Sequence, residues 1–166
     1  MQRYAAVLLM PFIALSGFLV VKNFLADPVV EEIVQVAAEQ EYYTPAGLRS
    51  KVMLSDGTSI WLNADSRLTV KEGFGVKTRE VELVGEAFFD VTTNESLPFM
   101  VGTSDMNIKV VGTTFNVSAY PEDELLEAVL VEGKIEVLSE MAEEMEIQPE
   151  QLIRFDKKDS KLTVID

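Results

Sequence analysis

The order of apolar and polar residues divides the chain into two unlike parts. Residues 4–21 form an uncharged apolar run between Arg3 and Lys22. From Leu48 onward, apolar and polar residues instead alternate with a period of two, in short runs such as TSIWLN, EAFFDV and KIEVLS. This period is typical of strands with one buried face, and turn residues interrupt the runs about every 8 to 12 positions. The pattern predicts an all-β domain, an antiparallel β-sandwich or roll, preceded by a single apolar N-terminal helix.

The apolar run has the length of a membrane-spanning helix. Its residues would span roughly 27 Å as a helix, close to the thickness of the hydrocarbon core of a bilayer. A cleaved signal peptide is the alternative, but its apolar region is usually about 7 to 15 residues long and ends at a small-x-small site. Here the candidate site, Phe24-Leu25-Ala26, begins with Phe. We therefore predict an uncleaved transmembrane anchor. The predicted span includes Tyr4, Pro11, Gly17 and Val21.

The pattern predicts three parts in the chain: a transmembrane anchor (1–22), a juxtamembrane stalk (23–45) and a β domain (46–166). The stalk pattern fits helical and extended conformations equally well. Within the β domain, Ser139–Glu146 is the one helical candidate, and its acidity fits a loop equally well.

The stretch SDGTSIWLNADSRL, residues 55–68, predicts a hairpin. A two-residue turn would place the apolar residues of its two strands on opposite faces. A three-residue loop that ends at Gly57 pairs Val52 with Ile60 and brings both to one face, with Gly57 in the left-handed conformation that such a loop requires. This arrangement buries more apolar surface, so we expect it, and Trp61 then points to the opposite face.

The charge balance limits the partners of the protein. Of the 14 basic residues, two lie within residues 1–22, so the remainder carries 12 basic and 28 acidic residues, a net charge of −16. Such a surface repels phosphate backbones, and we expect no nucleic-acid partner. The chain has no histidine and no cysteine, which removes the commonest general base, the commonest metal ligand and any disulfide.

The remaining polar motifs fit structural roles better than chemistry. Asp56 is placed at a turn, where its side chain can bond the backbone two residues on. The serines of the hairpin lack a histidine or lysine that could activate them. The acidic cluster Glu122-Asp123-Glu124 lacks the ligand spacing of a calcium loop. The strand EVELVGEAFFDV places Glu86 and Asp90 on one face, expected to be solvated, with Phe88 between them. We predict no catalytic, metal or cofactor site and no enzyme, and a carboxylate-based hydrolase using Glu86 or Asp90 ranks last.

Four segments, in order, resemble the periplasmic domain of FecR-type anti-sigma regulators. They are PAGLRSKVMLSDGTSIWLNADSRLTV, REVELVGEAFFDVTTNESLPFMV, IKVVGTTFNVSAYPED and VLVEGKIEVL, within about residues 45–138. A weaker fifth segment, IQPEQLIRF, lacks the Gly that the family usually has between Pro149 and Glu150.

The resemblance implies a non-enzymatic signal relay. In this family an outer-membrane TonB-dependent transporter contacts the periplasmic domain through its signalling domain. The change then passes through a single inner-membrane helix to an extracytoplasmic-function sigma factor. The resemblance thus implies an inner-membrane protein with residues 23–166 in the periplasm. The sigma-binding region of the family normally precedes the anchor, where only Met1-Gln2-Arg3 stand here. We expect a sigma-factor partner only if that region is restored.

Two further expectations concern surfaces. The alternative function, a cell-envelope structural or glycan-binding β-domain, predicts a groove of exposed aromatics. The aromatic candidates are Tyr42, Tyr43, Trp61 and Tyr120.

For partner docking, an unpaired strand edge can accept an added strand. The candidate edges are 48–54 and 134–138, unless the 151–165 segment covers them. The predicted partner-binding residues are Lys134, Ile135, Glu136 and Val137.

Overall fold

The computed structural model describes residues 15–18, 22, 38–139 and 142–166. The chain divides into two compact units, Met1–Gln35 and Val36–Asp166. In the first unit the described residues are helical and include Gly17, whereas Tyr4, Pro11 and Val21 of the predicted span lie outside the described residues. Within the described part of the chain, no helix is both long enough and apolar enough to span a membrane.

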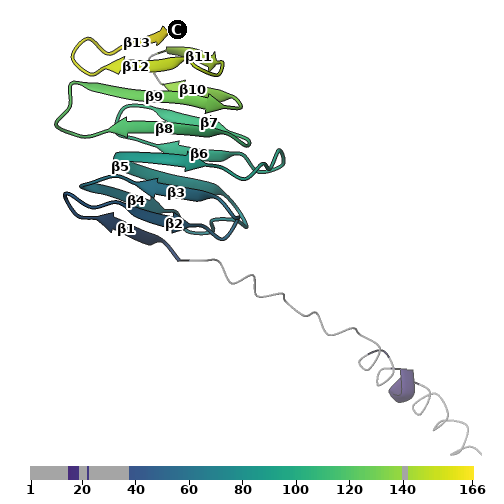
Figure 1. The fold of residues 1–166 in the computed structure, drawn as a ribbon. Helices are drawn as coiled ribbons and strands as arrows, with labels where there is room; N and C mark the ends of the chain where they lie inside the picture. The colour runs from purple at the N-terminus through teal and green to yellow at the C-terminus, as the bar shows by residue number, and fades with distance from the viewer. Residues whose placement is uncertain (1–14, 19–21, 23–37, 140–141) are drawn as a thin grey trace, which may run out of the picture. The chain divides into compact units, whose positions relative to one another are not determined.

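The second unit is an all-β domain, as the alternating pattern predicts. Its strands stack in one direction, from β1 and β2 at one end to β11 and β13 at the other (Figure 1). The strands are β1 (Gln40–Thr44), β2 (Ser50–Met53), β3 (Ser59–Leu62), β4 (Ser66–Val70), β5 (Arg79–Asp90), β6 (Phe99–Gly102), β7 (Asn107–Val110), β8 (Thr114–Ala119), β9 (Leu125–Glu132), β10 (Ile135–Ser139), β11 (Ala142–Ile147), β12 (Leu152–Asp156) and β13 (Lys161–Ile165). Strand β1 pairs with β4, so the domain begins before the predicted boundary at residue 46.

Two sheets share the long strand β5. Sheet A has the order β1-β4-β5-β6-β7-β10-β11, and sheet B has the order β2-β3-β5-β8-β9-β12-β13. Every pair is antiparallel except the parallel pair of β5 and β6. Strand β5 changes sheet at Gly85, which has a φ of +98°. A Cβ at this position would lie 2.8 Å from the Cα of Ser66, so only glycine fits the crossing point.

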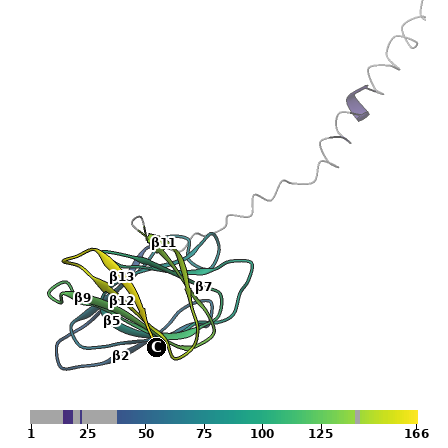
Figure 2. The ribbon, with the colours of Figure 1, turned by 90° about the horizontal axis from the view of Figure 1, so that it is seen from above.

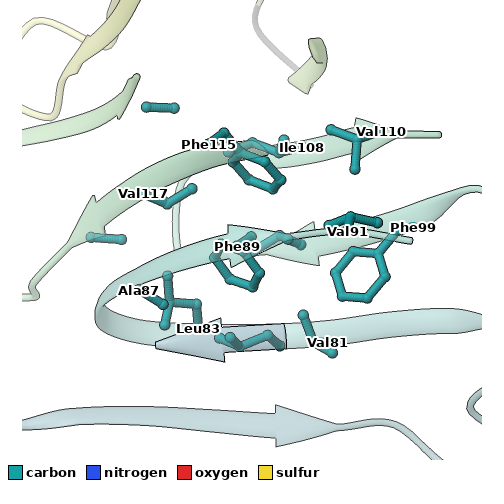
Figure 3. Packing of buried hydrophobic residues seen from close by; sticks show 14 of the residues in the cluster. Val81, Leu83, Ala87, Phe89, Val91, Phe99, Ile108, Val110, Phe115 and Val117 are labelled. Atoms are coloured by element: carbon teal, nitrogen blue, oxygen red, sulfur yellow. The ribbon is translucent and has the colours of Figure 1, made fainter. Parts of the chain in front are cut away.

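The core lies between the two sheets, which enclose it when the stack is viewed from its end (Figure 2). One buried row crosses sheet B at the centre of this core, and its rings of Phe89 and Phe115 stack at 4.9 Å (Figure 3). The row consists of Val52, Ile60, Phe89, Phe115 and Leu130. Such inward rows arise because side chains alternate between the faces of a strand.

The hairpin prediction is confirmed. Val52 pairs with Ile60, and the Leu54 N–H donates to the Thr58 carbonyl at 2.9 Å, which leaves a three-residue loop. Gly57 has a φ of +88°, in the left-handed region. The Asp56 carboxylate accepts the backbone N–H of Thr58 at 2.9 Å, as predicted for the turn.

Asp56 also forms a buried ion pair that the sequence analysis did not predict. The guanidinium of Arg79 donates to the Asp56 carboxylate at 2.7 Å, and the exposed fractions of the two side chains are 1% and 11%. The same guanidinium donates to the carbonyls of Leu97 and Thr92 at 3.1 and 2.6 Å. It therefore joins the hairpin loop, the start of β5 and the loop that follows β5.

The helical alternative at 139–146 is wrong. Most of this segment belongs to the antiparallel hairpin of β10 and β11, in which Val137 pairs with Met145 and Glu136 with Glu146. Glu146 of β11 is exposed, which fits a strand with one solvated face.

Candidate functional site

The outer face of sheet B carries a row of mostly apolar side chains across the sheet, here called the apolar row. The row runs through seven strands in register, one residue from each, and it begins with a lysine and two aromatic residues. Its members are Lys51, Trp61, Phe88, Asn116, Val129, Leu152 and Ile165. Directly cross-strand side chains contact one another, so this register builds a continuous surface.

A groove of about 470 Å³ lies at the β2 end of this row. Its aromatic wall is formed by Trp61, which is 38% exposed, and Phe88. The two rings meet edge to face, with centroids 5.6 Å apart. The ammonium of Lys51 lies 4.5 Å from the centre of the Trp61 ring, a cation–π contact that fixes the lysine over the indole.

The polar side of the groove is a hydrogen-bonded chain of side chains. The Glu86 carboxylate accepts the amide N–H groups of Asn63 at 2.6 Å and Asn116 at 3.0 Å. Arg49 in turn donates its Nε–H to the Asn63 amide oxygen at 3.0 Å. Within the described part of the chain, Glu86 has no basic side chain within 4.0 Å, and neither Arg49 nor Lys51 has a carboxylate within that distance. The groove therefore offers charged groups whose charges are not neutralised by ion pairs.

The aromatic candidates do not gather in one groove. Tyr42 packs against the core, and the Tyr43 hydroxyl donates to Asp65 on the outer face of sheet A. The Tyr120 hydroxyl donates to the Ala64 carbonyl at 2.8 Å. Of the four, Trp61 lines the groove, and the sequence analysis missed Phe88 as its partner.

The register of β3 against β5 is the signal that could have identified Phe88 as the neighbour of Trp61. Alternation in the sequence places Trp61 on the face opposite Ile60, and it places Phe88 on the face of Glu86. Pairing Ile60 with Phe89, the two central core positions, sets Trp61 directly opposite Phe88. Alternation defines the faces of each strand separately, but it does not define which strands pair.

The edge predicted at 134–138 is wrong. Strand β10 pairs with β7 on one side and with β11 on the other, so it is an interior strand of sheet A. Strand β11, rather than the 151–165 segment, covers it. Ile135 and Val137 are fully buried, and Lys134 and Glu136 form ion pairs with Glu146 and Lys109 at 2.5 and 2.8 Å. The partner-binding role of these residues stays a prediction, without the free edge that motivated it.

The other candidate edge, residues 48–54, contains an edge strand. Strand β2 pairs with β3 and with no other described strand. It borders the groove, to which it contributes Ser50 and Lys51.

Comparisons with known proteins agree with this architecture. The sequence model of the family described as FecR protein matches residues 40–136. Two crystal structures of a candidate anti-sigma factor from Parabacteroides distasonis ATCC 8503, at 2.50 and 1.65 Å resolution, are 34% and 35% identical to the chain. Both superpose with a TM-score of 0.73 and cover 77% and 76% of this chain. No curated protein matches the chain.

The family match spans more than half of the chain, so the chain belongs to the FecR family. The four segments of the sequence analysis predicted this membership, and it is confirmed. The chain spans 60% and 59% of the lengths of the two similar structures.

Proposed function

We propose that this chain is the signal-receiving β domain of a FecR-type anti-sigma regulator and that it acts by binding proteins rather than by catalysis. The observation that carries the proposal is the family match over residues 40–136, together with the likeness to the Parabacteroides candidate anti-sigma factor over three quarters of the chain. In this role the domain couples the signalling domain of a TonB-dependent outer-membrane transporter to an extracytoplasmic-function sigma factor. The sigma factor takes part in this relay only if the cytoplasmic sigma-binding region of the family is joined ahead of residues 1–3.

We further propose that residues 1–22 anchor the chain in the inner membrane and that the β domain lies in the periplasm. The uncharged run of residues 4–21 supports this topology. Alkaline phosphatase joined after Asp166 tests it, because that enzyme is active only after export. We expect high phosphatase activity in the membrane fraction. High activity in the soluble fraction would favour a cleaved signal peptide, and low activity would contradict export.

The relay is tested by direct binding. The purified chain is titrated with the signalling domain of each TonB-dependent transporter encoded in the same genome, with calorimetry as the readout. We expect one signalling domain to bind, and we expect deletion of the chain to change transcription from the cognate sigma factor's promoters. Absence of binding to every signalling domain, with unchanged transcription, would refute the relay.

A glycan-binding domain of the cell envelope is the second candidate function. The groove favours it, because Trp61 and Phe88 offer an apolar wall beside the amide and carboxylate groups of Asn63, Glu86 and Asn116. Glycan-array binding that is lost in Trp61→Ala and retained in Tyr43→Ala would support this function. An array without signal would exclude it in favour of the relay.

A further inference from the structure

Strand β2 presents unpaired main-chain groups at the edge of sheet B. The Leu54 N–H donates to the Thr58 carbonyl, so Leu54 and Thr58 form a hydrogen-bonded pair. Such pairs alternate along an antiparallel ladder, which makes Val52 and Ile60 the next hydrogen-bonded pair. The N–H and C=O groups of Lys51 and Met53 therefore point away from β3, and no described strand pairs with them.

The outer side of this edge carries positive charge that no ion pair with a described carboxylate neutralises. Lys51 and Arg49 are exposed, and neither forms an ion pair with a described carboxylate, although the chain has 28 acidic and only 14 basic residues. A strand added beside β2 would place a side chain directly opposite Lys51 on this face. Charge complementarity favours a carboxylate at that position.

The inner side of the same edge is apolar. A cleft of about 130 Å³ lies between the ends of the two sheets, and the inward-facing Leu54 lines it. Side chains of an added strand alternate between the two faces, so every second one would point toward this cleft. The apolar residues that line the cleft include Tyr42, Leu54, Val70 and Phe74.

The edge of β1 at the same end of the stack lacks these features. Its outward side chains are already paired, because Glu41 forms an ion pair with Arg67 at 3.2 Å and the Tyr43 hydroxyl donates to Asp65 at 3.0 Å. An added strand at β1 would have to compete with these contacts. On the outer face of β2, Lys51 contacts the Trp61 ring and Arg49 donates to Asn63, but neither cation forms an ion pair with a described carboxylate that an added acidic side chain would have to displace.

We propose that β2 is a docking edge that takes an extended strand of a partner protein in which acidic and apolar side chains alternate. The acidic side chains face Lys51 and Arg49, and the apolar side chains face the cleft beside Leu54. The main-chain groups of Lys51 and Met53 continue sheet B into the partner. This inference deepens the proposed relay by naming the docking surface and the chemistry of the partner, and it rests on that relay for its biological role.

Synthetic peptides test the chemistry directly. One labelled peptide alternates Glu with Val, and a matched peptide alternates Lys with Val; fluorescence anisotropy measures the binding of each to the full chain. We expect the Glu peptide to bind and the Lys peptide to bind at least about tenfold more weakly, a difference of ~1.4 kcal/mol. Equal binding of the two peptides, or no binding of either, would overturn the proposal.

Two pairs of variants locate the site. Met53→Pro removes an outward N–H, which an edge strand tolerates, whereas Met53→Ala shortens the side chain and keeps the N–H. We expect Met53→Pro to weaken binding of the Glu peptide about tenfold and Met53→Ala to change it less.

The double variant Arg49→Glu/Lys51→Glu should reverse the preference, so that the Lys peptide binds more tightly than the Glu peptide. Lys158→Glu/Lys161→Glu, which changes the net charge equally at the β12–β13 turn, should leave the preference unchanged. Equal effects of the two double variants would show that net charge, not this edge, selects the peptide.

Further outcomes separate the proposal from its rivals. A signalling domain that binds the wild type and both Met53 variants equally leaves the relay intact and refutes the β2 edge. A chain that binds the Glu peptide but no signalling domain keeps the docking edge and refutes the relay. A wild-type dimer that rejects both peptides and dissociates on Met53→Pro would assign the edge to a second copy of the chain and overturn the proposal.

Discussion

The outer faces of the two sheets differ in how their side chains are satisfied. On sheet A, cross-strand ion pairs follow one another, among them Lys71–Glu82 at 2.7 Å and Lys109–Glu136 at 2.8 Å. On sheet B, the outer face carries the apolar row from Trp61 to Ile165. Among the described residues, the ion pair beside this row is Arg154–Glu127. Both faces are built on the same strand, β5.

This difference indicates that the outer face of sheet A is suited to solvent and that the outer face of sheet B is suited to binding a partner. Exposed ion pairs contribute little to stability, but they neutralise the charges that a partner would otherwise contact. Half-exposed aromatic residues beside unpaired cations instead leave binding energy available, because aromatic and arginine side chains dominate protein interfaces. This contrast supports the proposed docking at the β2 edge of sheet B rather than on sheet A.

Removing the Arg79 guanidinium should have the largest effect, because it would damage both faces through β5. Arg79→Met leaves the Asp56 carboxylate, 11% exposed, without its partner at 2.7 Å. Breaking a buried ion pair in this way costs about 3–5 kcal/mol. Urea unfolding measures the free energy of unfolding. Because Arg79→Met/Asp56→Ala leaves no unpaired charge, it should recover part of the loss. If Arg79→Met costs less than the double variant, the ion pair does not support the hairpin.

Replacing the exposed aromatic residue of each face by alanine should have the next largest effect. Trp61 and Tyr43 are both exposed aromatic residues beside a cation, with Lys51 at 4.5 Å and Arg67 at 5.8 Å from their ring centres. Trp61→Ala also removes the edge-to-face contact with Phe88, so we expect a loss of about 1 kcal/mol in the free energy of unfolding.

Partner binding distinguishes the two aromatic variants more sharply than stability does. Trp61→Ala should weaken binding of a signalling domain, whereas Tyr43→Ala should leave it unchanged. Calorimetric titration measures both affinities. Weaker binding in Tyr43→Ala alone would move the interface to sheet A.

The sequence predicted the local elements well because they depend on near neighbours. The hairpin loop followed from two apolar positions on each side and one glycine, and the faces of β5 followed from strict alternation. Alternation cannot show which strands are neighbours. The sequence therefore showed that Lys134–Val137 has the pattern of a strand, but not that β7 and β11 enclose it.

The candidate site depended on the same long-range information. Trp61 could be placed on the solvated face, but its neighbours Phe88 and Asn116 come from strands later in the chain. Arg79 is the clearest case. The hairpin loop and the loop that follows β5 converge to bury it with Asp56, and no short-range pattern in the sequence marks that convergence.

Neutralising a lysine should affect the two faces differently. Lys109→Met breaks an ion pair of sheet A, so we expect a loss below about 1 kcal/mol that shrinks at 1 M salt, where exposed charges are screened. Lys51→Met removes no ion pair with a described residue, and its unfolding free energy should show no comparable salt dependence. Urea unfolding at low and high salt measures both. A larger salt-dependent loss in Lys51→Met would show that sheet B also holds its charges in internal pairs.

The smallest expected effect is a change in proton affinity on sheet A. The Tyr43 hydroxyl donates a hydrogen bond to Asp65, and that bond and the negative charge of Asp65 raise the pKa of Tyr43, while Arg67 opposes the shift. Because the folded-state pKa is raised, the stabilisation from this hydrogen bond is complete below the ordinary tyrosine pKa of 10.0 and disappears as the pH rises through the raised value. Asp65→Asn removes the charge, so the pKa of Tyr43 should fall toward its ordinary value. Titration of the assigned Tyr43 ring-carbon resonance by NMR measures this change, with the wild type titrated under the same conditions. If the pKa of Tyr43 does not change in Asp65→Asn, this hydroxyl is not committed to an internal partner, and sheet A retains a polar group that is free to bind.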